Sequence, residues 1–311
     1  MRLILPLISA LLLGCAPKAV PPETMPQVPD WSVDRDALPG GTLRALAVAY
    51  TGSAERLVVQ GGGSERLSLP VWVYVFEHPT EGTVLIDAGF PRRTSVSTAD
   101  YPGRQMAKLL SVTMEPGAAA VDRLPEAGLD PAEVRHIVLT HMHPDHVAGV
   151  EDFPAATLHV GPGEWEAAFR GGALGKPDTS PFEGRQGVQH VDFAGSGAYG
   201  PFEGHRDLFG DGSVVVMQAG GHTPGHMAVM LNLKGGSWLF TGDCAWVDRH
   251  WQEPAPKSAL VRGLLEDDWR LNWANQWRLH VFGQAHPELV IVGGHEAATA
   301  TKLKPWPQTM E

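Results

Sequence analysis

The run His-Met-His-Pro-Asp-His at residues 141–146 limits what this chain can fold into more than any of its other features. Three imidazoles and one carboxylate within six residues pack poorly but bind metal well. His141 and His143 are two residues apart, so they point to the same side of an extended chain and can bind one ion. The proline that follows ends the extended segment, so Asp145 and His146 can face a second ion after the turn. The alternative is a surface loop in which histidines gather by chance.

The residues before this run predict a strand that presents it. Residues 136–140, His-Ile-Val-Leu-Thr, are mostly apolar or β-branched and predict a short buried strand. Asp145 can then open a helix through residues 147–148. We therefore expect the ligand-type side chains on a loop at the carboxyl end of a strand, where a rigid scaffold commonly presents chemistry.

Three later segments repeat the pattern of an apolar strand followed by a possible ligand. They are residues 214–217 before a glycine-rich turn with His222 and His226, residues 238–240 before Asp243, and residues 289–292 before His295. One histidine at a strand end is weak evidence, because such residues are more often structural. Four strands that each end in a ligand-type residue converge most simply on one site.

These motifs, in this order, resemble those of the metallo-β-lactamase fold superfamily of binuclear metal hydrolases. The resemblance covers about residues 42–304, and Leu-Ile-Asp-Ala-Gly at 85–89 also matches the first loop of that family. It implies an α/β fold, a four-layer αββα sandwich in which two similar halves meet at the metal edge. It also implies a ligand set: His141, His143 and His222 on the first metal, Asp145, His146 and His295 on the second, and Asp243 bridging the two.

The donor types suit this assignment. Imidazole and carboxylate ligands without a thiolate cluster favour two zinc ions, with iron, manganese or cobalt as alternatives. Two dications lower the pKa of a shared water, so that hydroxide forms at neutral pH and attacks a carbonyl or phosphoryl centre. Asp145 and Asp243 are the expected catalytic residues, Asp145 by passing a proton to the leaving group.

The leading hypothesis is a hydrolase of small-molecule esters, lactones or related acyl compounds. One alternative is an iron-dependent sulfur dioxygenase or other oxidoreductase of the same fold. The full second ligand set of Asp145, His146 and His295 speaks against it. Others are a β-lactam hydrolase, a thioester hydrolase like glyoxalase II, and an anchored protein with a vestigial site. Similar β-lactam-opening enzymes generally lack the bridging aspartate, so Asp243 argues against that activity.

Four residues beside the expected ligands are more ambiguous. By resemblance Asp87 orients a ligand histidine, although it could simply form a turn. His226 is expected to lie behind the ligands or to begin the next strand. Cys244 is expected to be a small buried residue rather than a ligand. Trp246 occupies the position where similar homoserine-lactone hydrolases place a tyrosine that contacts the substrate carbonyl. This departure argues against acyl-homoserine-lactone specificity.

The N-terminus carries a second signal. A short positive start precedes an apolar stretch at residues 3–13, which is too short to span a bilayer, and Leu-Leu-Gly-Cys at 12–15 resembles a bacterial lipobox. We expect residues 1–14 to be a lipoprotein signal peptide, with Cys15 the lipid attachment site. The protein would then be lipid-anchored in the bacterial cell envelope and face the periplasm, with the outer membrane favoured. The alternative is an ordinary signal peptide cut elsewhere.

The remaining chain is expected to form one hydrolase domain. Residues 15–41 contain the anchor cysteine and a proline-rich tether, residues 42–304 the domain, and residues 305–311 a tail. Segments 90–117 and 170–212 are expected to shape the pocket. The net charge of −11, with no basic stripe, argues against nucleic acid as a partner.

The sequence also predicts a tryptophan-bearing helix. Trp269, Trp273 and Trp277 recur every four residues, which predicts a helix packed on the sheet or, alternatively, a wall for an apolar substrate.

Overall fold

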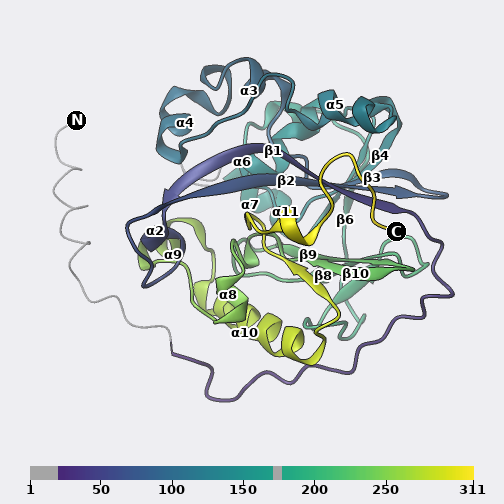
Figure 1. The fold of residues 1–311 in the computed structure, drawn as a ribbon, viewed down its shortest axis with the longest axis vertical. Helices are drawn as coiled ribbons and strands as arrows, with labels where there is room; N and C mark the ends of the chain where they lie inside the picture. Colours follow the sequence, from purple (N-terminus) through teal and green to yellow (C-terminus); the bar gives the residue numbers. More distant parts are fainter. Residues whose placement is uncertain (1–19, 171–176) are drawn as a thin grey trace.

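A computed structural model describes residues 20–170 and 177–311 of the chain (Figure 1). The expected signal peptide and Cys15 lie outside the described residues. Within the described ranges, no helix is both long enough and apolar enough to cross a membrane.

Two mixed β-sheets form the centre of the molecule. The first has the order β1-β2-β3-β4-β5-β6 and the second β11-β10-β9-β8-β7. The strands are β1 Thr42–Ala54, β2 Arg66–His78, β3 Gly82–Ile86, β4 Val134–Val138, β5 Thr157–Val160, β6 Val188–His190, β7 His205–Asp207, β8 Val214–Gln218, β9 Met227–Leu233, β10 Gly236–Phe240 and β11 Val290–Val292. Strands β3 to β6 pair in parallel, as do β10 and β11, whereas the other neighbours are antiparallel.

Helices cover the outer face of each sheet. The α-helices of the described residues are α2 Glu55–Val58, α3 Arg92–Val96, α4 Arg104–Leu110, α5 Ala120–Arg123, α6 Pro144–Val147, α7 Glu164–Arg170, α8 Arg249–Gln252, α9 Ala259–Leu265, α10 Trp269–Ala285 and α11 Thr299–Lys302. In Figure 1, α3, α4 and α5 lie beyond the first sheet, and α8 and α10 lie beyond the second. This is the expected four-layer αββα sandwich, and the prediction of fold class is confirmed.

Alternation along the strands explains the layers. In β3, Val84 and Ile86 face the core between the sheets, whereas Leu85 faces the helices outside the first sheet. In β8, Val216 faces the same central core and Val215 packs outward under α10. Successive side chains of a strand point to opposite faces, so strands that are apolar at every position need both faces covered.

The N-terminal part of the described chain is attached to the body. Residues 20–41 form no helix, and β1 begins directly after them. The Trp31 ring lies 5.6 Å from that of Phe282 and 5.3 Å from that of His286, in edge-on geometry. Arg35 donates to the carbonyl oxygen of Leu233 at 2.7 Å. The segment expected as a tether is thus extended but held along the second half of the molecule.

The C-terminal residues also contact the body. Leu43 in β1 and Met310 exchange two backbone hydrogen bonds of 2.9 Å each, and Met310 is buried. The expected tail therefore closes on the outermost strand of the first sheet, which shields part of that strand's edge.

The two halves approach closely where β5 meets the turn before β9. A Cβ on Gly161 would lie 1.8 Å from the carbonyl oxygen of Gly225. We expect Gly161→Ala to lower the free energy of unfolding by about 1–3 kcal/mol, because one of the two backbones must move. Urea denaturation measures the change.

Gly263→Ala in α9 is the matched control. Nothing lies within 4 Å of the added Cβ, and alanine is favoured over glycine inside a helix by about 0.5–1 kcal/mol. We expect this variant to be as stable as the parent or slightly more stable. Equal effects of the two substitutions would contradict the close approach.

Candidate metal centre

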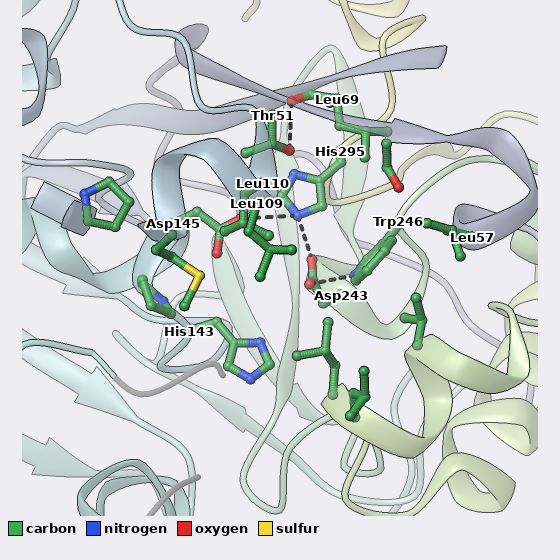
Figure 2. A pocket seen from close by; sticks show the side chains of 18 of the residues that line it. Thr51, Leu57, Leu69, Leu109, Leu110, His143, Asp145, Asp243, Trp246 and His295 are labelled. Atoms are coloured by element: carbon green, nitrogen blue, oxygen red, sulfur yellow. Dashed lines mark hydrogen bonds and ion pairs between the residues drawn. The ribbon is translucent and has the colours of Figure 1, made fainter. Parts of the chain in front are cut away.

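Four loops bring the expected ligands to one edge of the sandwich. Strand β4 ends three residues before His141, the first residue of the run that also holds His143 and His146, and β10 ends three residues before Asp243. His222 follows β8 and His295 follows β11. One half of the site thus comes from each sheet, and Figure 2 shows His143, Asp145, Asp243 and His295 around the same pocket.

The first group comprises His141, His143, His222 and Asp243, whose ligand atoms all lie within 4.8 Å of one another. The Nε2 atom of His222 lies 3.0 Å from Nδ1 of His143 and 3.2 Å from Oδ2 of Asp243. Nε2 of His141 lies 3.8 Å from the same carboxylate oxygen. Three nitrogens and one oxygen from different loops therefore converge.

The second group comprises Asp145, His146 and His295. The Nε2 atoms of the two histidines are 3.4 Å apart, and Oδ2 of Asp145 lies 3.6 Å from Nε2 of His295. The other oxygen of Asp243, Oδ1, lies 3.3 Å from His146 and 3.1 Å from His295. Each oxygen of the Asp243 carboxylate therefore faces one of the two groups.

The residues present fit a divalent metal. Nε2 of His141 and Oδ1 of Asp243 are buried and have no hydrogen-bond partner among the described residues. Such groups are costly to bury unless something satisfies them, and a cation at each group would do so. The imidazole and carboxylate donors are those that zinc prefers, and iron, manganese and cobalt also accept them.

The carboxylate of Asp87 fixes the orientation of the ligand loop. It accepts hydrogen bonds from the backbone N–H of Thr140 at 2.8 Å and from its hydroxyl at 2.9 Å, and it lies 2.7 Å from Nδ1 of His146. Asp87 has a φ of 57°, so the backbone turns sharply after β3. The residue therefore does more than form a turn, because it aims Nε2 of His146 at the site.

The local charges set the protonation of the histidines. Burial lowers the pKa of His143 to about 4 and lowers the pKa of His141 and His222, so their rings are neutral and keep a lone pair for a ligand. Burial also opposes protonation of His146, but the carboxylates of Asp243 and Asp87 outweigh it and raise the pKa of that ring.

Trp246 contacts the candidate bridging residue directly. Its Nε1–H donates to Oδ2 of Asp243 at 2.6 Å, as Figure 2 shows, and its ring lies 6.0 Å from that of His295. Trp246 also lines the pocket. The indole hydrogen is therefore already used to hold the carboxylate.

Lys257 is a buried residue beside the site that the sequence did not predict. Its Nζ donates to the carbonyl oxygen of Asp243 at 2.5 Å and to Oε1 of Glu266 at 2.9 Å, and it lies 4.9 Å from the centre of the Trp246 ring. Both side chains of the Lys257–Glu266 pair are almost fully buried. Lys257 thus holds the loop of Asp243 from behind. No motif surrounds it, and its partners are brought together only by the tertiary fold.

His226 and Cys244 lie behind the ligands. The His226 ring is buried 5.2 Å from that of His141, and neither of its nitrogens has a partner among the described residues. Burial lowers the pKa of His226 to about 3. His226 belongs to neither ligand group. Cys244 is buried, as predicted, and burial raises the pKa of its thiol to about 12.

A cavity of about 310 Å³ opens beside the candidate metal centre, and its walls are mainly apolar. Segment 90–117 contributes Phe90, Tyr101, Met106, Leu109 and Leu110, as expected. The described part of segment 170–212 contributes no lining residue, and residues 171–176 of that segment lie outside the described residues. Residues 188–190 and 205–207 of that segment instead form edge strands.

The predicted tryptophan helix is α10, and its three tryptophans do not line the pocket. Trp273 is buried, and the helix packs on the second sheet through Leu279 and Phe282. The interpretation as a packed helix is confirmed.

Comparison with known proteins shows which family this arrangement belongs to. The Metallo-beta-lactamase superfamily matches residues 68–295. N-acyl homoserine lactonase AttM of Azorhizobium caulinodans is 32% identical over 205 residues, which cover 63% of this chain and 72% of the relative. AttM of Agrobacterium fabrum is 28% identical over 258 residues, which cover 80% of this chain and 90% of the relative.

Solved structures show the same fold. An N-acyl homoserine lactone hydrolase with N-hexanoyl-L-homoserine bound at its catalytic metal centre superposes with a TM-score of 0.69 at 20% identity, over 87% of this chain and 99% of that one. AidC, a dizinc quorum-quenching lactonase, gives a TM-score of 0.55 at 14% identity, over 88% and 90% of the two chains.

The buried Lys257–Glu266 pair generates a prediction. We expect Lys257→Met to lower the free energy of unfolding by about 3–5 kcal/mol, because it leaves the Glu266 carboxylate buried without its cationic partner. Adding Glu266→Gln should recover part of that loss. Urea denaturation of both single variants and the double variant measures the coupling, and metal content is determined alongside.

Lys234→Met is the control, since Lys234 is exposed. Its stability and metal content should match those of the parent. Additive losses in the double variant would contradict a direct interaction between Lys257 and Glu266.

Proposed function

The chain belongs to the metallo-β-lactamase superfamily and is a lactonase-like metallohydrolase, and we propose that it uses two divalent ions, zinc in the first instance, to hydrolyse a lactone or related acyl ester. The observation that supports two ions is the orientation of Asp243. Its Oδ2 faces His141 and His222, whereas its Oδ1 faces His146 and His295. One carboxylate between two sets of nitrogens is the arrangement expected of a bridging ligand.

The ligands of the first ion would be His141, His143 and His222, and those of the second Asp145, His146 and His295, with Asp243 shared. Two divalent ions supply Lewis acidity, which lowers the pKa of a water molecule and polarises a substrate carbonyl. The complete second ligand group also argues against the oxidoreductase alternative, an iron-dependent sulfur dioxygenase.

The side chains of this chain would do the remaining work. Asp145 lines the pocket, and we assign to its carboxylate the transfer of a proton to the leaving alkoxide oxygen. Trp246 and Lys257 hold the Asp243 carboxylate and its backbone in place. The apolar walls formed by Phe90, Leu69 and neighbouring residues exclude water from the acyl part of a substrate.

The relatives support a lactone as the substrate class. AttM of two organisms is an N-acyl homoserine lactonase, and the solved neighbours include lactonases with hydrolysed product bound. Trp246 remains the difference from similar enzymes. Its indole N–H already donates to Asp243, and the side chain has no hydroxyl that could donate to a substrate carbonyl.

Metal analysis followed by a substrate panel tests the proposal. We expect two equivalents of zinc or a similar divalent metal, loss of activity with a chelator, and turnover of lactones above thioesters, phosphotriesters and a chromogenic β-lactam. One equivalent of iron with oxygen consumption would favour the dioxygenase. Bound metal without turnover of any class would favour a vestigial site.

Asp145 offers a test of proton transfer. We expect Asp145→Asn to reduce kcat for lactone hydrolysis by about 10²–10⁴-fold, because the amide cannot deliver the proton. Metal content must be measured in the same preparation, since Asp145 belongs to the second ligand group. Asp100→Asn, an exposed substitution of the same chemistry, serves as the control. Full turnover by Asp145→Asn with both metals bound would remove the proposed role.

Trp246 offers a test of specificity. We expect Trp246→Tyr to raise kcat/KM for an N-acyl homoserine lactone by about tenfold, since a hydroxyl that reaches the carbonyl is worth about 1–2 kcal/mol. Trp246→Phe lacks both donors and should not show this gain. An equal gain in the two variants would indicate that only the size of the side chain matters.

A further inference from the structure

Exposed leucines surround the mouth of the pocket. Leu109 is 62% exposed, Leu260 38% and Leu264 53%, yet all three also line the cavity. We call these three residues the mouth rim. Leu109 lies on α4, and Leu260 and Leu264 lie one turn apart on the same side of α9. The pocket therefore opens between two helices whose leucines face solvent.

This exposure is concentrated rather than scattered. Single exposed apolar side chains are normal on a protein surface, but apolar residues gathered around an opening indicate an interaction site. A fourth exposed leucine, Leu271, lies in the first turn of α10, and the guanidinium of Arg262 in α9 stacks 4.3 Å from the Trp269 ring at the start of that helix. The Arg262–Trp269 contact thus joins α9 to the start of α10, where Leu271 adds one more exposed leucine.

The first described residue, Val20, contacts helix α10. The Nε1–H of Trp273 in α10 donates to the carbonyl oxygen of Val20 at 3.0 Å. In Figure 1, α4, α9 and the start of the coloured chain lie on the same side of the molecule. An anchor on the residues before Val20 would therefore attach the protein on the side where the pocket opens.

The short distance to Cys15 limits how the protein can face a membrane. Val20 is the fifth residue after Cys15, and five residues reach at most about 18 Å. Residues 20–41 add no slack, because Trp31 and Arg35 fix them to the body. If Cys15 carries lipid, the bilayer lies within that reach of Val20, on the side of the molecule that holds α4 and α9.

The charges near the mouth do not favour an electrostatic partner. Arg104 and Lys108 are exposed on α4, whereas Asp267 and Asp268 are exposed before α10. With both signs present and a net charge of −11, a strongly anionic surface is not favoured. Apolar contact is what the rim offers.

We propose that the mouth rim docks on the surface of a lipid bilayer, so that the pocket opens toward the membrane on which the protein is held. This interaction surface goes beyond the hydrolytic activity and does not depend on which ester is cleaved. The leucines would enter the boundary between headgroups and acyl chains, where apolar side chains of peripheral proteins gain free energy.

An environment-sensitive label tests the contact. The full chain is reconstituted on phosphatidylcholine vesicles, and a nitrobenzoxadiazole label is attached through Leu264→Cys or, as the control, through Val96→Cys. Cys244 is buried and does not compete for the label, and a Cys15→Ser background is tested in parallel. Val96 is 80% exposed but does not line the pocket.

We expect the label at position 264 to shift to the blue, to brighten at least about twofold on vesicles, and to be quenched by nitroxide-labelled lipid. The label at position 96 should do none of these. Unchanged emission at 264 in vesicle-bound protein would overturn the proposal. A blue shift at 264 without vesicles would overturn it too: one that grows with protein concentration indicates a second copy, and one independent of concentration indicates the apolar N-terminal stretch as the occupant. Because hydrolysis is not read, the outcome is independent of the proposed activity.

Discussion

The structure depends on one buried carboxylate placed between two sets of imidazoles. Asp243 follows β10, and its two oxygens face histidines that come from both sheets. Burial disfavours this charge, but His295 and His146 outweigh the cost and lower the pKa of the carboxyl well below its usual range. Trp246 holds the carboxylate, and Lys257 holds the backbone behind it. A charge this deep is stable because oppositely charged and hydrogen-bonding groups surround it.

Much of this arrangement could be predicted from the sequence because it is local. Short apolar runs predicted β8 and β10, and the six-residue run at 141–146 supplied four ligand-type side chains within one loop. The parts that could not be predicted depend on long-range packing. Lys257 meets Glu266 and Asp243 only in the folded chain, and Met310 returns to pair with Leu43 from the far end of the sequence. The length and composition of segment 170–212 likewise do not specify where its described residues lie relative to the pocket.

The candidate ligands are divided between the two sheets, and this division links metal binding to the contact between the sheets. The loops after β3 and β4 belong to the first sheet, whereas those that carry His222, Asp243 and His295 belong to the second. Neither half alone presents a complete set for either candidate ion. Bound metal would therefore strengthen the contact between the sheets, and the apolar core between them would in turn hold the ligands in register.

Position 87 requires both an unusual backbone conformation and a carboxylate, and this limits which substitutions it can accept. Its backbone adopts a φ of 57°, which glycine, asparagine and aspartate tolerate best, and its carboxylate accepts from Thr140 while facing His146. Glycine would satisfy the backbone without the acceptor, and asparagine would turn an amide N–H₂ toward groups that already donate. A lineage descended from this chain has almost no neutral route away from aspartate here. A copy that drifts at this position while keeping the rest of its core is one in which selection for the metal site has already ceased.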